Sequence, residues 1–99
     1  MAAKRSTPLI DPSTTVVATA AQVSCELGEE TAILHTESGV YYGLDPVGTR
    51  VWQLLQEPVT VAEIRDAMLR EFDVSAAQLD GDLRRLLVDL AAAGLVTLA

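Results

Sequence analysis

The chain has 99 residues, 49% of them hydrophobic and four of them aromatic, and its formal net charge is −7. A chain of this length forms one domain with a modest core and little room for a deep catalytic cavity. Its seven Lys and Arg residues form no run, so the acidic balance argues against nucleic acid binding, which needs a basic surface. One cysteine excludes an internal disulfide, no apolar run approaches the ~20 residues of a membrane span, and the N-terminus lacks the apolar centre of a secretory signal. We therefore expect a soluble cytoplasmic protein.

The first fifteen residues are predicted to form a flexible tail. Residues 1–15 are mostly polar, contain two prolines and show no hydrophobic periodicity. Lys4 and Arg5 offer charges to an acidic partner, but solvation alone also accounts for them. The folded domain is expected over residues 16–99.

Three β-strands are predicted in the first half of this domain. Residues 16–27 are β-prone, and in their second half Val23, Cys25 and Leu27 alternate with polar residues. Turn sequences at residues 28–30 and 37–39 separate this strand from two more, at residues 31–35 and 40–44. The prediction is an antiparallel meander of three strands, with residues 16–20 extending the first strand.

The third strand runs directly into a helix. Asp45 is a good N-cap, and Pro46 suits the first helical position because its missing N–H has no partner there. The stretch from Glu37 to Leu55 therefore holds a strand at a fixed place against the helical part, and an edge of that strand can receive another chain. Tyr41 and Tyr42 point to opposite faces of it, so one can enter the core while the other is free for binding.

Two further helices are expected. Thr60 and Glu63 are predicted to form a capping box that opens the second helix, and Ser75 and Gln78 a second capping box that opens the third. The third helix spans residues 75–93, and its apolar stripe comprises Leu79, Leu83, Leu86, Leu87 and Leu90. Three strands followed by three helices predict an α+β fold, a small winged-helix-like domain.

The residues that carry chemistry do not form a catalytic pattern. Cys25 and His35 lie on neighbouring predicted strands, but no third group completes a nucleophilic site, and we interpret Cys25 as a small core residue. One Cys and one His cannot make a zinc site of the usual composition, and no phosphate-binding loop occurs. We expect no enzyme activity, no metal and no cofactor.

Three stretches in order carry a resemblance to a known family. They read E-S-G-x-Y-Y-G-L-D-P-V-G-x-x-V-W-x-L-L, then P-x-T-V-A-E-I, then D-L-x-x-L-L-x-x-L-x-x-x-G-L-V. From about Val23 to Leu98 the chain resembles the PqqD-like proteins, the recognition elements for ribosomally synthesised and post-translationally modified peptides (RiPPs). The resemblance implies three strands followed by three helices, in agreement with the prediction above.

The resemblance also implies a function and a set of residues. Proteins of this family bind the N-terminal leader of a precursor peptide, which adds as a strand to the third strand and lies against the third helix. Carried over to this sequence, the docking edge comprises Val40, Tyr41, Tyr42, Gly43 and Leu44. The helix wall comprises Leu83, Arg84, Leu86, Leu87 and Leu90. We expect Leu87→Asp to weaken leader binding without unfolding the domain.

Several alternatives stay open. The stand-alone chain resembles the leader-binding proteins of lasso-peptide clusters, whose partners are a leader peptidase and a cyclase, and we favour this setting. The alternative is a resemblance to the leader-binding proteins of quinone-cofactor biosynthesis, whose partner is a radical-SAM enzyme. A winged-helix DNA-binding regulator is a second class, but the long helix holds three Asp residues against Arg84 and Arg85. A small hydrolase using Cys25 is a third, which Cys25→Ser tests.

Overall fold

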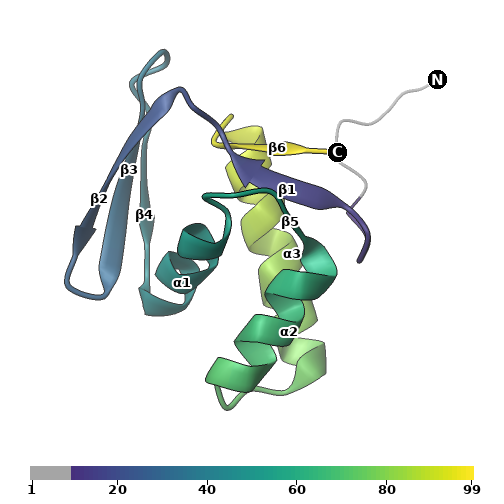
Figure 1. Cartoon of the computed structure of the whole chain (residues 1–99). Coiled ribbons are helices and arrows are strands. Elements are labelled where there is room, and N and C mark those ends of the chain that lie inside the picture. Colours follow the sequence, from purple (N-terminus) through teal and green to yellow (C-terminus); the bar gives the residue numbers. More distant parts are fainter. Residues whose placement is uncertain (1–9) are drawn as a thin grey trace.

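The computed structural model describes residues 10–99, which form an α+β fold with two small antiparallel sheets and three helices (Figure 1). The first sheet has the order β2-β3-β4, as the sequence predicts for a meander. Its strands are β2 (Gln22–Leu27), β3 (Glu30–His35) and β4 (Tyr41–Leu44). The helices are α1 (Pro46–Leu54), α2 (Val61–Glu71) and α3 (Ala76–Ala92). Among the residues described, no helix is both long and apolar enough to cross a membrane.

The second sheet was not predicted. It has the order β5-β1-β6, with β1 (Thr15–Ala18) between β5 (Val59–Thr60) and β6 (Val96–Leu98). The prediction that residues 16–20 extend the first strand of the meander is therefore wrong. Alternation within a short segment identifies a strand but not its partners, and both partners of β1 lie far away in the sequence.

The predicted tail is wrong for residues 10–15, the last of which already begins β1. Ile10 is buried, and the Asp11 carboxylate accepts hydrogen bonds from the backbone N–H and the hydroxyl of Ser13. The carbonyl of Pro12 accepts from the N–H of Ala62 at the start of α2. A single turn of this kind has no periodicity by which the sequence could reveal it. Residues 1–9, including Lys4 and Arg5, lie outside the described residues.

The predicted caps form, and they fix where each helix begins. The Asp45 carboxylate accepts from the N–H of Gly48 (2.7 Å), and Thr60 and Glu63 form the reciprocal capping box. Ser75 accepts from the N–H of Gln78 (3.2 Å), but the Gln78 side chain does not return the bond, so the predicted second capping box is only half formed. Behind these caps lies one core between the sheets and the helices. It includes Val16, Ile33, Leu44, Val51, Trp52, Leu55, Ile64, Met68, Leu83, Leu87 and Leu90.

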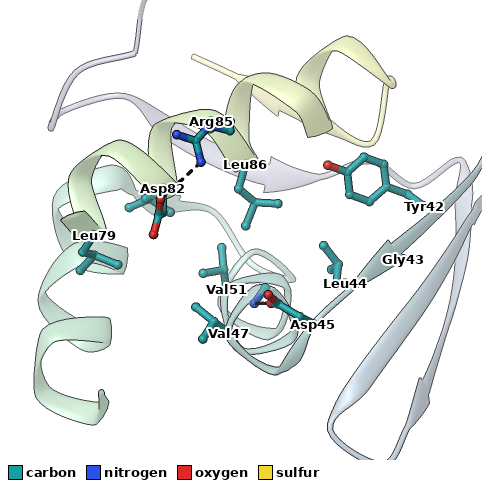
Figure 2. Close-up of a pocket in the computed structure, with 12 residues that line it drawn as sticks. Tyr42, Gly43, Leu44, Asp45, Val47, Val51, Leu79, Asp82, Arg85 and Leu86 are labelled. Carbon is teal, nitrogen blue, oxygen red and sulfur yellow. Dashed lines mark hydrogen bonds and ion pairs between the residues drawn. The ribbon is translucent and has the colours of Figure 1, made fainter. Parts of the chain in front are cut away.

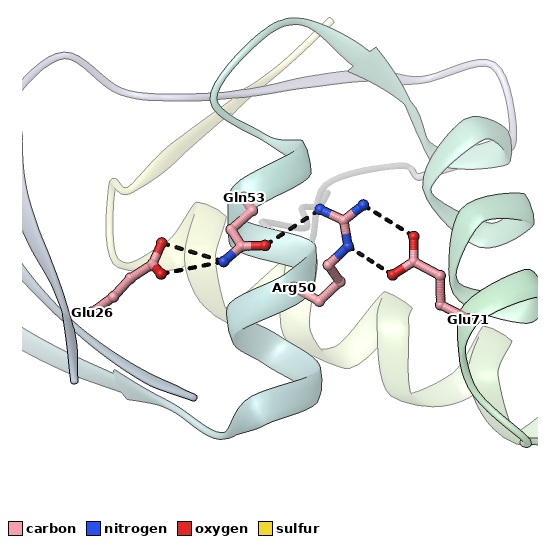
Figure 3. A network of polar contacts seen from close by, with 4 residues as sticks. All are labelled: Glu26, Arg50, Gln53 and Glu71. Atoms are coloured by element: carbon pink, nitrogen blue, oxygen red, sulfur yellow. Dashed lines mark hydrogen bonds and ion pairs between the residues drawn. The ribbon is translucent and has the colours of Figure 1, made fainter. Parts of the chain in front are cut away.

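A chain of polar contacts joins α2, α1 and β2 on the surface (Figure 3). Arg50 donates to both carboxylate oxygens of Glu71 (2.7 and 3.0 Å) and to Gln53 (3.3 Å). Gln53 in turn donates to Glu26 of β2 (3.3 Å). The hydrogen bond and charge of Arg50 hold the pKa of Glu71 below its ordinary value of 4.5.

We expect the stabilisation from Glu71 to depend on pH. Because its pKa is lowered on folding, the contribution is present above the ordinary pKa of 4.5 and is lost as pH falls below that value. Thermal denaturation should therefore show a lower melting temperature for Glu71→Gln than for the wild type at neutral pH, and this difference should disappear in acid. Glu57→Gln is the matched control, since Glu57 is exposed and has no ion pair among the described residues. A difference in melting temperature that does not change with pH contradicts this expectation.

Candidate functional site

β4 forms an edge of the first sheet, and its outer side is unpaired within residues 10–99. The N–H at the end of β3 donates to the Val40 carbonyl (2.9 Å). Because hydrogen-bonded pairs alternate in an antiparallel ladder, Val40, Tyr42 and Leu44 direct their backbone groups toward β3. Tyr41 and Gly43 direct theirs to the open side. A Cβ added to Gly43 would meet nothing within 4 Å, so the face of the sheet is uncovered at this residue.

A cavity of about 550 Å³ lies beside this edge, between β4, α1 and α3. We call it the β4–α3 groove. Figure 2 shows Tyr42 and Leu44 of β4 on one side, Val47 and Val51 of α1 below, and Leu86 of α3 opposite. The full lining comprises Tyr42, Gly43, Leu44, Asp45, Val47, Gly48, Val51, Leu79, Asp82, Leu83, Arg85 and Leu86. Its walls are thus largely apolar, with three charged residues.

The charged groups at this groove are mainly acidic. Asp45 is held by its capping hydrogen bond, and Asp82 pairs with Arg85 at 3.4 Å across an exposed turn of α3 (Figure 2). At the Tyr42 end, burial of the ring and the adjacent Asp89 carboxylate raise the pKa of the Tyr42 hydroxyl. Asp89 therefore lies next to the groove, one helical turn beyond Leu86.

The five predicted edge residues divide between the two faces of the sheet. Tyr42 is half-buried and lines the groove, and Leu44 is buried where the groove meets the core. Tyr41 is 72% exposed on the outer face, so Tyr42 is the inward tyrosine of the pair. Val40 lies just before β4 and is 46% exposed, and Gly43 is exposed. All five belong to the open edge or to the turn that leads into it.

The residues of the predicted helix wall divide between the groove, the core and another part of the surface. Leu83 and Leu86 line the groove, but Leu87 and Leu90 are fully buried in the core. Arg84 lies away from the groove and donates to the Ile10 carbonyl (3.1 Å). On a helix with leucines at 83, 86, 87 and 90, hydropathy alone does not show which ones meet the core.

Several groove residues were missed by the sequence. They are Asp45, Val47, Gly48, Val51, Leu79 and Asp82. Two signals in the sequence point to them. Val47 and Val51 are four residues apart on α1, and Leu79, Asp82 and Leu86 recur at helical spacing on α3, so each set shares a face. Neither signal says that these two faces meet beside β4.

Cys25 and His35 do not come together. In the register Cys25 pairs with Ala32 and His35 pairs with Gln22, at positions of opposite side-chain direction. Cys25 is exposed, so its interpretation as a core residue is wrong. His35 ends β3, where its Nδ1 accepts from the N–H of Ser38 (3.1 Å). Within residues 10–99, no group of three or more His, Cys, Asp or Glu is arranged to hold a metal ion.

An open strand edge beside a largely apolar groove is the geometry by which proteins take up an extended peptide as an additional strand. The fold and the site thus have the geometry of the class of domains that bind peptides in this way.

Comparison with known proteins agrees with this class. The chain belongs to the PqqD family: residues 30–96 match the family model described as coenzyme PQQ synthesis protein D. It is also similar to TbiB1 in its solved complex with the TbiA(β) leader peptide, with 39% sequence identity and a TM-score of 0.75. That similarity covers 81% of this chain and 93% of the TbiB1 chain. No match was found among curated proteins.

Proposed function

We propose that this protein is a non-catalytic RiPP recognition element that binds the leader of a precursor peptide by β-strand addition to β4. The open edge of β4 beside the β4–α3 groove is the observation that carries this proposal. The similarity to TbiB1, which was solved with a leader peptide, supports it. Membership of the PqqD family supports it independently.

The edge of β4 binds the backbone of the leader, and the groove binds its side chains. The N–H and C=O groups of Tyr41 and Gly43 bond to the backbone of the added strand, and this interaction tolerates many sequences. Side chains of an added strand alternate between two faces, so every second one enters the groove opposite Tyr42 and Leu44. There they contact the apolar walls formed by α1 and α3. Selectivity for the leader therefore resides in the groove.

The proposal includes delivery of the leader to maturation enzymes in the cytoplasm. A leader peptidase and a cyclase of lasso-peptide biosynthesis are the first candidates, because the sequence motifs resemble those of leader-binding proteins from lasso-peptide clusters. A surface for such a partner is present on the outer face of the first sheet, where Val23, Leu27 and Tyr41 are 61%, 64% and 72% exposed. The added strand would extend this same face.

The description of the family model favours a second candidate, a peptide chaperone for a radical-SAM enzyme in quinone-cofactor biosynthesis. The two candidates differ in the enzyme that the leader-bound protein activates. Reconstitution with the peptidase and cyclase, or with the radical-SAM enzyme, encoded near the gene distinguishes them. Processing of the precursor in only one mixture identifies the pathway.

An NMR titration tests the leader-binding proposal. Leader peptides encoded near the gene, and the TbiA(β) leader, are added to the ¹⁵N-labelled protein, with a short DNA duplex as control. We expect saturable shifts at residues 41–44 and along the groove side of α3, residues 79–86, and none with DNA. No response to any leader, or a response to DNA alone, would contradict the proposal.

A further inference from the structure

Asp89 lies at one end of the β4–α3 groove. On α3, Asp82, Leu86 and Asp89 are spaced by four and three residues, so they share the face that turns toward β4. Leu86 lines the groove, and the Asp89 carboxylate lies beside the hydroxyl of Tyr42, another lining residue (Figure 2 shows Tyr42 and Leu86). A peptide strand added to β4 passes between these two elements.

The carboxylate of Asp89 has no cationic partner among residues 10–99. The ion pairs of the described chain are Arg50–Glu71, Arg65–Asp80 and Arg85–Asp82. Arg85 is the cation at the groove, and it lies one turn earlier on α3, with Asp82. The Tyr42 hydroxyl can hydrogen-bond to this carboxylate but brings no positive charge. A peptide covering Tyr42 and Asp89 would therefore remove water from a charge that lacks a counter-ion, which is unfavourable unless the peptide supplies one.

We propose that the peptide bound in the β4–α3 groove carries a Lys or Arg side chain that pairs with Asp89 at the Tyr42 end. This inference rests on the proposed function and adds a charge requirement to it. The net charge of −7 acts in the same direction, because it attracts a cationic peptide at long range. The apolar walls then bind the neighbouring inward side chains.

Selection from a random peptide library tests this requirement whatever the sequence of the natural leader. Displayed random 12-residue peptides are selected on immobilised wild type, Asp89→Lys and Asp73→Lys. At ~3.3 Å per residue, an extended peptide of this length is longer than β4. Asp73 is the matched control, because it is exposed like Asp89 but lies in the connection between α2 and α3 and does not adjoin Tyr42. Binding of one selected peptide is then compared between the wild type and Asp89→Asn.

We expect the wild type and Asp73→Lys to enrich Lys or Arg at one fixed distance from the apolar positions. Asp89→Lys should enrich Asp or Glu at that same position. Asp89→Asn should weaken binding of a wild-type-selected peptide about two- to fivefold, the range for a partly exposed ion pair. Raising the salt concentration should reduce this difference.

The outcomes separate this inference from the proposed function. If the selected peptides share apolar positions but no charged one, Asp89 has no role in recognition, although binding in the groove is retained. The same holds if Asp89→Lys enriches the same charge as the wild type. A selected peptide that binds the wild type equally well after its basic residue is replaced by alanine would also overturn the role of Asp89. No enrichment by any of the three proteins counts against peptide binding itself.

Discussion

Replacement of Tyr41 by proline is expected to weaken leader binding by about tenfold or more while the domain stays folded. The N–H of Tyr41 points to the open side of β4, so proline there removes a donor that the added strand needs and none that β3 uses. Loss of one backbone hydrogen bond and the steric bulk of the ring together account for a change of about 1.4 kcal/mol, which is tenfold. Isothermal titration with the leader identified by NMR measures the change.

Two control variants isolate the backbone effect. Tyr41→Ala keeps the N–H and removes the outward-facing ring, so it should bind the leader more tightly than Tyr41→Pro. Ser24→Pro places proline on the opposite open edge, because the N–H of Thr36 donates to Ala21 and the alternation leaves Ser24 facing outward. It should leave leader binding unchanged. An equal loss of leader affinity in Tyr41→Pro and Ser24→Pro would mean that β4 is not the docking edge.

Neighbouring leucines on α3 are expected to respond to the same substitution in opposite ways. Leu87→Asp should unfold the domain, because Leu87 is fully buried and the new carboxylate would have no partner there. Even Leu87→Ala should cost about 2–5 kcal/mol, a large part of the stability of a small domain. The expectation from the sequence that Leu87→Asp spares the fold is therefore replaced by its opposite.

Leu86→Asp should instead retain the fold and lose leader binding. Leu86 is half-buried and its side chain faces the β4–α3 groove, so the carboxylate can remain in water while it makes the wall polar (Figure 2). Circular dichroism melting curves and leader titrations of both variants check the pair. A folded Leu87→Asp, or an unfolded Leu86→Asp, would show that the core and groove faces of α3 are assigned wrongly.

The exposed side of β2 shows how a correct pattern can lead to a wrong location. The alternation of Val23, Cys25 and Leu27 against polar residues is present in the strand, yet the apolar side faces outward. On the inner side Glu26 receives a hydrogen bond from Gln53 of α1. A core position for Cys25 followed from the assumption that apolar residues face inward, and that rule fails here because the core and the helices lie against the opposite face of this sheet.

The sequence by itself determined the features that depend on neighbours in the chain. The turns, the direct passage from strand to helix at Asp45 and Pro46, the capping residues and the meander are all set by short-range hydrogen bonds and backbone preferences. The ordered motifs also pointed to the PqqD family, which the family model confirms.

Only the tertiary structure decided the features that depend on distant partners. It placed β1 between β5 and β6, separated Leu86 from Leu87, and brought Val47 and Val51 to Leu79 and Leu86 beside β4. Each depends on which of several similar apolar faces meet. That choice depends on the packing of the whole chain, since the hydrophobic effect has no direction of its own and local pattern cannot supply one.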